Sequence, residues 1–144
     1  LASRSAAEFK NPYKAFSSVE TEIYYLPEFY YWDGEPTSIG CNYGGTLSFS
    51  SNKAGTKTEF VLKNCALIKN FILTGTGSYN ANNDRFVLDV ATTGRWTCDL
   101  KYVRRTETIN ITGKCDGKNM NENYNDEAHN LHNVHDFHAP KEDR

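Results

Sequence analysis

Hydrophobic and polar residues alternate along the middle of the chain, from residue 41 to residue 117. Successive side chains of a strand point to opposite faces, so a period of two is typical of a half-buried β-strand. The alternation occurs in segments separated by short turns rich in Asn, Gly, Asp or Thr. The segments are residues 46–50, 57–63, 71–78, 85–91, 96–103 and 108–115. We therefore predict an all-β fold, an antiparallel meander of about six strands that is sandwich- or barrel-like, with one buried and one polar face.

The two ends of the chain lack this alternation. Residues 1–22 are polar with weak periodicity, and Asn11-Pro12 is typical of a break. From residue 118 onward the pattern is lost again, and Asn is frequent. We predict three regions. They are an N-terminal arm with an aromatic segment (1–40), a disulfide-bonded antiparallel β domain (41–117) and an extended, acidic C-terminal arm rich in Asn and His (118–144).

An aromatic cluster lies within residues 24–32. Pro27 inside the segment and Pro36 after it disfavour a central strand. An edge strand or an ordered loop fits better. Its members are Tyr24, Tyr25, Phe29, Tyr30, Tyr31 and Trp32. Three interpretations are open. The rings could complete the core or cover the sheet. Alternatively, the interface candidates Tyr30, Tyr31 and Trp32 could contact another subunit, because Tyr and Trp favour interfaces. The rings could also form a flat platform for a glycan.

The chain has four cysteines and no CxxC motif, which disfavours zinc ribbons and thioredoxin-type sites. A hairpin with a loop at 105–108 pairs residue 104 with 109, and Cys98 then faces Cys115 directly. Opposed residues in a non-hydrogen-bonded pair are close enough for a disulfide. The second bridge, Cys41–Cys65, follows by elimination. It requires a bulge near Asn64, because Cys65 is out of phase with the strand before it. Formally, three connectivities remain open.

The setting is predicted to be extracellular. An even number of cysteines and the sequon Asn110-Ile111-Thr112, a candidate glycosylation site, favour an exported protein. A net charge of −2 and a pI near 6.1 provide no electrostatic basis for binding nucleic acid. No apolar run is long enough to span a membrane.

All the histidines lie in the C-terminal arm and recur at every third residue. They are His129, His132, His135 and His138. One hypothesis is a divalent transition metal site for Zn, Cu or Ni, although no cofactor is required. On a straight helix or extended chain, however, rings at this spacing do not converge on one ion. The apolar residues Leu131, Val134 and Phe137 share the period and could dock the arm on a surface instead. A pH-sensitive contact and a disordered tail are further alternatives.

Motifs for catalysis are missing, including GxSxG, HExxH, the P-loop and GxGxxG. We therefore predict a protein that binds rather than an enzyme. The favoured function is a secreted structural or adhesive subunit that self-associates through its terminal arms into a homo-oligomer or polymer. Such a subunit would belong to a cell surface, a matrix or a filament. The alternatives are a metal-binding module that uses the histidines and a carbohydrate-binding module that uses the aromatic run 24–32.

Overall fold

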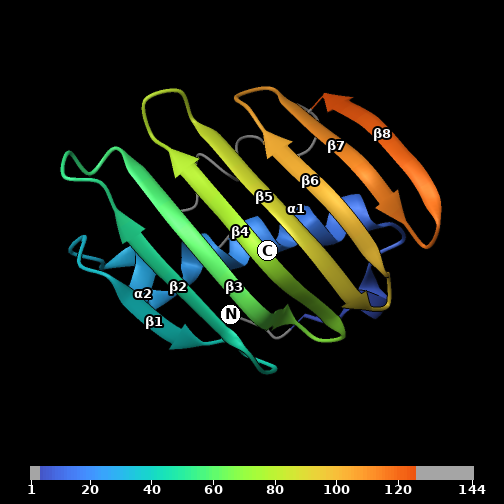
Figure 1. Ribbon diagram of the computed structural model, residues 1–144, viewed down its shortest axis with the longest axis horizontal. Helices are drawn as coiled ribbons and strands as arrows, with labels where there is room; N and C mark the ends of the chain where they lie inside the picture. Colours follow the sequence, from blue (N-terminus) through green and yellow to red (C-terminus); the bar gives the residue numbers. More distant parts are fainter. Residues whose placement is uncertain (1–3, 126–144) are drawn as a thin grey trace.

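The computed structural model describes residues 4–125 of the chain. It consists of one eight-stranded antiparallel sheet, whose strands lie side by side in chain order, with a helix across one face (Figure 1). The helices are η1 (Ala6–Glu8), α1 (Pro12–Tyr25) and α2 (Pro27–Tyr30). The strands are β1 (Thr37–Gly40), β2 (Thr46–Ser51), β3 (Lys57–Ile68), β4 (Phe71–Asn80), β5 (Arg85–Gly94), β6 (Cys98–Arg104), β7 (Thr108–Cys115) and β8 (Lys118–Asn125).

The predicted all-β meander is confirmed, and its six predicted segments correspond to β2 through β7. The sheet is wider than predicted, because β1 and β8 add a strand at each edge. It therefore extends beyond the expected boundaries at residues 41 and 117. The expected resemblance to a sandwich or barrel is wrong for residues 4–125. The layer that covers the apolar face of the sheet is a helix and not a second sheet (Figure 1).

The bulge predicted near Asn64 is confirmed. The pairing of β3 with β4 shifts between Leu62 and Cys65, and Asn64 has a positive φ of 48°. The extra residue returns Cys65 to the buried face that Leu62 occupies. Cys65 can therefore bond to Cys41, with 5.5 Å between the two Cα atoms.

The predicted register of the β6–β7 hairpin is also confirmed, because Arg104 pairs with Ile109 and Cys98 with Cys115. The two cysteines are directly opposed and form the second disulfide, with 4.0 Å between their Cα atoms. Such a short distance is typical of a non-hydrogen-bonded pair. Two disulfides in one small domain fit an oxidising compartment.

The expectation of an N-terminal arm is wrong for residues 12–25, which form α1. Asn11 caps the helix, because its side chain accepts a hydrogen bond from the Lys14 N–H (3.1 Å), and Pro12 occupies the first turn. The preceding residues are attached to the sheet as well. The Ala6 N–H donates to the Lys69 carbonyl (2.8 Å). Asn11-Pro12 is therefore the start of a helix and not a break between an arm and the core.

Helix α1 crosses the sheet from β8 towards β2, as Figure 1 shows from the opposite face. At its start, Tyr13 stacks on Tyr124 of β8, with 3.9 Å between ring centroids. In its second turn, fully buried Phe16 meets Phe71 of β4 edge-on. Beyond its end, Phe29 of α2 packs against Phe49 of β2. The hydrophobic core thus lies between this helical layer and one face of the sheet. No helix within residues 4–125 has the length and apolar composition needed to cross a membrane.

Candidate functional site

The predicted site residues of the C-terminal arm lie outside the described residues. These are the candidate metal ligands His129, His132, His135 and His138 and the docking residues Leu131, Val134 and Phe137. Within residues 4–125, no three His, Cys, Asp or Glu side chains are grouped so that they could hold a metal ion. The metal hypothesis therefore stays a prediction about the arm.

The aromatic run divides into a packed part and an exposed part. Trp32 packs edge-on against Phe49 (4.9 Å between centroids), and its Nε1–H donates to the Glu35 carbonyl (2.6 Å). In contrast, the side chains of Tyr30 and Tyr31 are 42% and 80% exposed. The structure therefore buries Tyr24 and packs Phe29 and Trp32 against the core, as the first interpretation expected, and presents two tyrosines to solvent.

The candidate glycosylation site Asn110 lies in β7 with its side chain on the open face of the sheet. Its Nδ2 donates to Oδ1 of Asn123 on β8 (2.7 Å). A glycan attached to Nδ2 of Asn110 would stand on the polar face beside β8. Glycosylation itself stays a prediction.

The strand β8 is an edge of the sheet, and β7 is its only strand neighbour among the described residues. Its pairing is continuous from Cys115–Lys118 to Thr108–Asn125, without a bulge. Natural proteins protect sheet edges with short strands, bulges, proline or inward-pointing charges, because unpaired backbone groups attract other strands. In β8 none of the first three is present. The opposite edge is protected, since β1 has only four residues and directly follows Pro36.

The turn before β8 determines which backbone groups face outward. Asp116 and Gly117 have φ values of 50° and 80°, which is typical of a two-residue type I′ hairpin. In such a hairpin Cys115 and Lys118 form a hydrogen-bonded pair, and such pairs recur at every second residue. The alternate residues of β8 therefore direct their N–H and C=O groups away from β7. These residues are Asn119, Asn121, Asn123 and Asn125.

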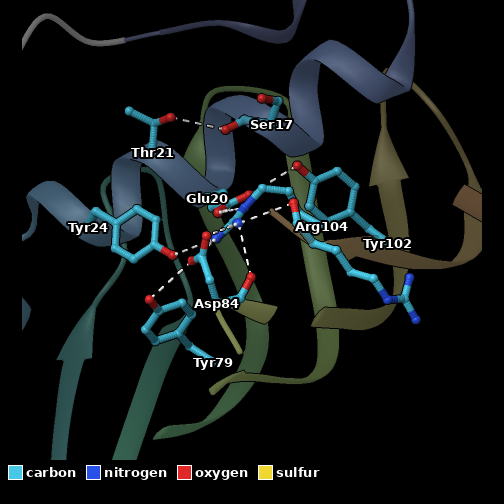
Figure 2. A network of polar contacts seen from close by, with 9 residues as sticks. Ser17, Glu20, Thr21, Tyr24, Tyr79, Asp84, Tyr102 and Arg104 are labelled. Carbon is cyan, nitrogen blue, oxygen red and sulfur yellow. Dashed lines mark hydrogen bonds and ion pairs between the residues drawn. The ribbon is translucent and has the colours of Figure 1, made fainter. Parts of the chain in front are cut away.

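A buried polar network attaches the helix to the sheet on the covered side (Figure 2). At its centre is Arg104, at the end of β6, whose side chain is completely buried. Its Nε donates to Oε2 of Glu20 on α1 (2.7 Å). Its Nη2 donates to Oδ1 of Asp84 in the β4–β5 turn (3.2 Å). One guanidinium thus joins a helix, a turn and a strand that are far apart in the sequence.

Three tyrosines complete this network. Tyr102 donates to Oε1 of Glu20 (3.1 Å), Tyr79 donates to Oδ1 of Asp84 (3.2 Å), and the Tyr24 hydroxyl accepts from Nη2 of Arg104 (3.3 Å). Burial and the neighbouring carboxylate of Asp84 raise the pKa of Tyr79 to about 12. Burial also raises the pKa of Tyr24 well above 10. The phenols therefore serve as neutral hydrogen-bonding groups.

Burial also shifts the pKa values of the charged members of the network. It raises the pKa of Glu20 above its ordinary value of 4.5, although the Arg104 guanidinium and the Tyr102 hydroxyl oppose the shift. For Arg104, burial alone would lower the pKa, but Glu20, Tyr24 and Asp84 together raise it. Arg104 is thus cationic at any pH at which the protein is folded. Glu20 and Arg104 are both almost completely shielded from solvent, and their ion pair joins α1 to β6.

Sequence reasoning missed both ends of this ion pair. The segment predicted at 96–103 ends before Arg104, although Arg104 continues the buried series Leu100 and Tyr102 with a period of two. Glu20 lies in the segment that was expected to be an arm. The signal that could have revealed it is the helical spacing of Phe16, Val19 and Ile23, which puts Glu20 on the same face.

A shallow depression of about 330 Å³ lies on the open face over β1, β2 and β3. Small hydroxyl side chains and one carboxylate line it, together with Pro36 and Val61. The polar members are Thr37, Ser38, Ser48, Ser50 and Glu59.

Comparisons with models of protein families, with curated proteins and with solved structures find no match to this chain. Functional inference therefore depends on the surfaces described above.

Proposed function

We propose that this chain is a secreted, non-enzymatic structural or adhesive subunit that self-associates through the start of its C-terminal arm, the strand β8. The observation that carries the proposal is the long, regular edge of β8, which contains no bulge and no proline. Outward-facing backbone groups of an edge strand are a template for another strand. Secretion is supported by the two disulfides.

The partner that fits this edge best is a second copy of the chain. Two identical edges that pair antiparallel are related by a twofold axis, so the contact uses the same surface on both subunits and closes at a dimer. The short β1 edge, preceded by Pro36, would not support a second contact of this kind. We therefore propose a homodimer as the basic unit, rather than a polymer built through both edges.

Replacing Asn121 with proline is expected to weaken this association at least about tenfold, because each copy loses an outward N–H donor and gains a ring at the edge. Asn121 does not direct its N–H towards β7, so the substitution removes no hydrogen bond within the β7–β8 hairpin. Sedimentation velocity across a concentration series measures the dimer–monomer equilibrium. Far-UV circular dichroism verifies that the sheet is retained.

The matched control is Asn121→Ala, which keeps the N–H donor and should dimerise like the native chain. A chain without residues 126–144 should also dimerise, because β8 is intact. The proposal is wrong if the native chain is monomeric across the series. It is also wrong if removing residues 126–144 is what allows dimers to form, because those residues would then cover the edge within one copy.

A second candidate function, glycan binding, is favoured by one observation. Tyr31 is 80% exposed and lies edge-on to Tyr30, with 4.9 Å between ring centroids. Solvent-exposed aromatic rings are suited to stacking on sugars, as they are to other flat ligands. Trp32 is a poor choice for testing this idea, because its loss would disturb packing against Phe49.

If glycan binding is correct, Tyr31→Ala should reduce binding to a glycan array about tenfold or more while leaving the melting temperature unchanged. Tyr43→Ala is the matched control, because Tyr43 is also an exposed tyrosine (40%) but lies outside the aromatic run. Equal binding by native protein and both variants would exclude Tyr31 as a sugar platform.

A further inference from the structure

The outer strand β8 has a sequence that is nearly symmetric about one residue. Residues 119–125 read Asn-Met-Asn-Glu-Asn-Tyr-Asn, with Glu122 at the centre. An antiparallel pair of identical strands places each residue opposite its mirror position in the other copy. A strand of this composition therefore meets a matching strand, with Asn opposite Asn on both sides of the centre.

The hydrogen-bonding pattern restricts how two such strands can pair. Only the alternate residues Asn119, Asn121, Asn123 and Asn125 direct backbone groups outward, as the turn at Asp116–Gly117 dictates. Outward-facing residues must therefore oppose outward-facing residues. This requirement places the twofold axis on a residue and not between two residues.

Among the registers that remain, the overlap of the strands selects one. With the axis at Glu122, Asn119 opposes Asn125 of the second copy and Asn121 opposes Asn123 of the second copy, so every outward-facing residue is paired. An axis at Met120, Asn121 or Asn123 leaves at least one outward-facing Asn without a partner in β8. Unpaired backbone groups that lose contact with water are costly, so the register centred on Glu122 is favoured.

The side chains on the covered face support the same register. Met120 and Tyr124 pack against the hydrophobic core of their own copy, and they share this face with Glu122 because side chains alternate. With the axis at Glu122, Met120 lies opposite Tyr124 of the second copy. An aromatic ring opposite a thioether is a favourable cross-strand pair, and two such pairs flank the axis.

We propose that two copies join antiparallel along β8 with the twofold axis at Glu122, forming one continuous sheet across the dimer. This inference rests on the proposed self-association and adds its geometry. One unfavourable contact results, because the two Glu122 carboxylates meet at the axis. Like charges directly opposite each other destabilise a strand pair. The contact limits the strength of the dimer and provides a test.

A scan of single cysteines identifies the axis. Residues opposite themselves in a non-hydrogen-bonded pair have Cα atoms about 4.5 Å apart, which is within disulfide range. We expect Glu122→Cys to form a covalent dimer under mild oxidation, as seen by non-reducing electrophoresis. Met120→Cys and Asn121→Cys should remain mainly uncrosslinked, because neither introduced cysteine lies opposite the same residue of the second copy. Thr76→Cys, on the open face of β4, reports crosslinking by random collision.

A second measurement does not depend on new cysteines. Glu122→Gln removes the like-charge contact and keeps the shape of the side chain, so its dimer dissociation constant should fall roughly two- to fivefold at neutral pH. Weaker association of this variant would overturn the register, because Glu122 would then have a favourable partner. Glu107→Gln, at an exposed position in the β6–β7 turn, is the matched control and should leave the constant unchanged.

The outcomes separate the register from the proposed function. Both the proposed self-association and the register would be overturned if the native chain stays monomeric and no β8 cysteine variant crosslinks above the level of Thr76→Cys. Dimers that crosslink through Met120→Cys or Asn121→Cys would retain self-association and overturn the axis at Glu122. Dimers that crosslink through none of the three β8 positions would show that copies associate through a different surface.

Discussion

Replacing Arg104 with methionine is expected to lower the free energy of unfolding by about 3–5 kcal/mol, the usual cost of removing one partner of a buried ion pair. The guanidinium is completely buried and bonds to Glu20 and Asp84. Methionine fills similar space but leaves the Glu20 carboxylate without its cation. Equilibrium unfolding in urea with the disulfides intact measures the change. The matched control is Arg105→Met, one residue further in an exposed position, which should change stability by less than about 0.5 kcal/mol.

The cost of Arg104→Met should depend on pH through Glu20. The folded-state pKa of Glu20 is already raised by burial, so its favourable contribution is complete below about pH 4.5 and declines as pH rises through the folded pKa. Without Arg104 the main opposing influence is gone and that pKa rises further. The variant should therefore lose more stability near pH 7 than near pH 4.

The same reasoning predicts partial rescue by Glu20→Gln, which removes the unpaired buried charge. At neutral pH the double variant should be more stable than Arg104→Met alone. A loss below about 1 kcal/mol for Arg104→Met would show that the network does not hold the helix on the sheet. A larger loss that does not change with pH would show that it does not arise from the charge of Glu20.

Truncating Phe16 to alanine is the second large effect, with an expected loss of about 3–5 kcal/mol. Its ring is fully buried in the second turn of α1 and meets Phe71 and Tyr102 of the sheet. The loss combines the transfer energy of the ring with the cavity it leaves. The midpoint of thermal or urea unfolding measures it.

Lys14→Ala is the control for this substitution, because Lys14 lies on the exposed side of the same helix and should change stability by less than about 0.5 kcal/mol. Comparable effects of the two substitutions would contradict the assignment of α1 as the cover of the sheet. The prediction also separates a core helix from the arm that the sequence suggested, because an arm would tolerate both changes.

Much of the sheet could be predicted from local pattern. The alternation of apolar and polar residues defined the strands, since a half-buried strand has no other period. Hairpin pairing then placed Cys98 opposite Cys115, and the phase of Cys65 required a bulge near Asn64. These features depend on residues close in sequence, where the geometry of strands and turns leaves few alternatives.

The edge strand was missed for a different reason. The segment KNMNENYN is poor in residues that favour strands, and its Asn-rich composition suggested the end of the core. The neglected signal was Asp116-Gly117, a pair typical of two-residue hairpins. This turn returns the chain along β7. Pairing with β7 then makes the segment a strand, which its composition would not predict.

The sequence by itself therefore determined the fold class, the order of the central strands, and the register of the β6–β7 hairpin that places Cys98 opposite Cys115. The tertiary structure alone decided what covers the sheet and where the buried charges meet. Glu20 and Arg104 are separated by 84 positions in the chain, and the local periods that place each on a buried face do not show that the two residues meet. Their contact exists because α1 packs across the strands, and packing between distant segments leaves no period in the sequence.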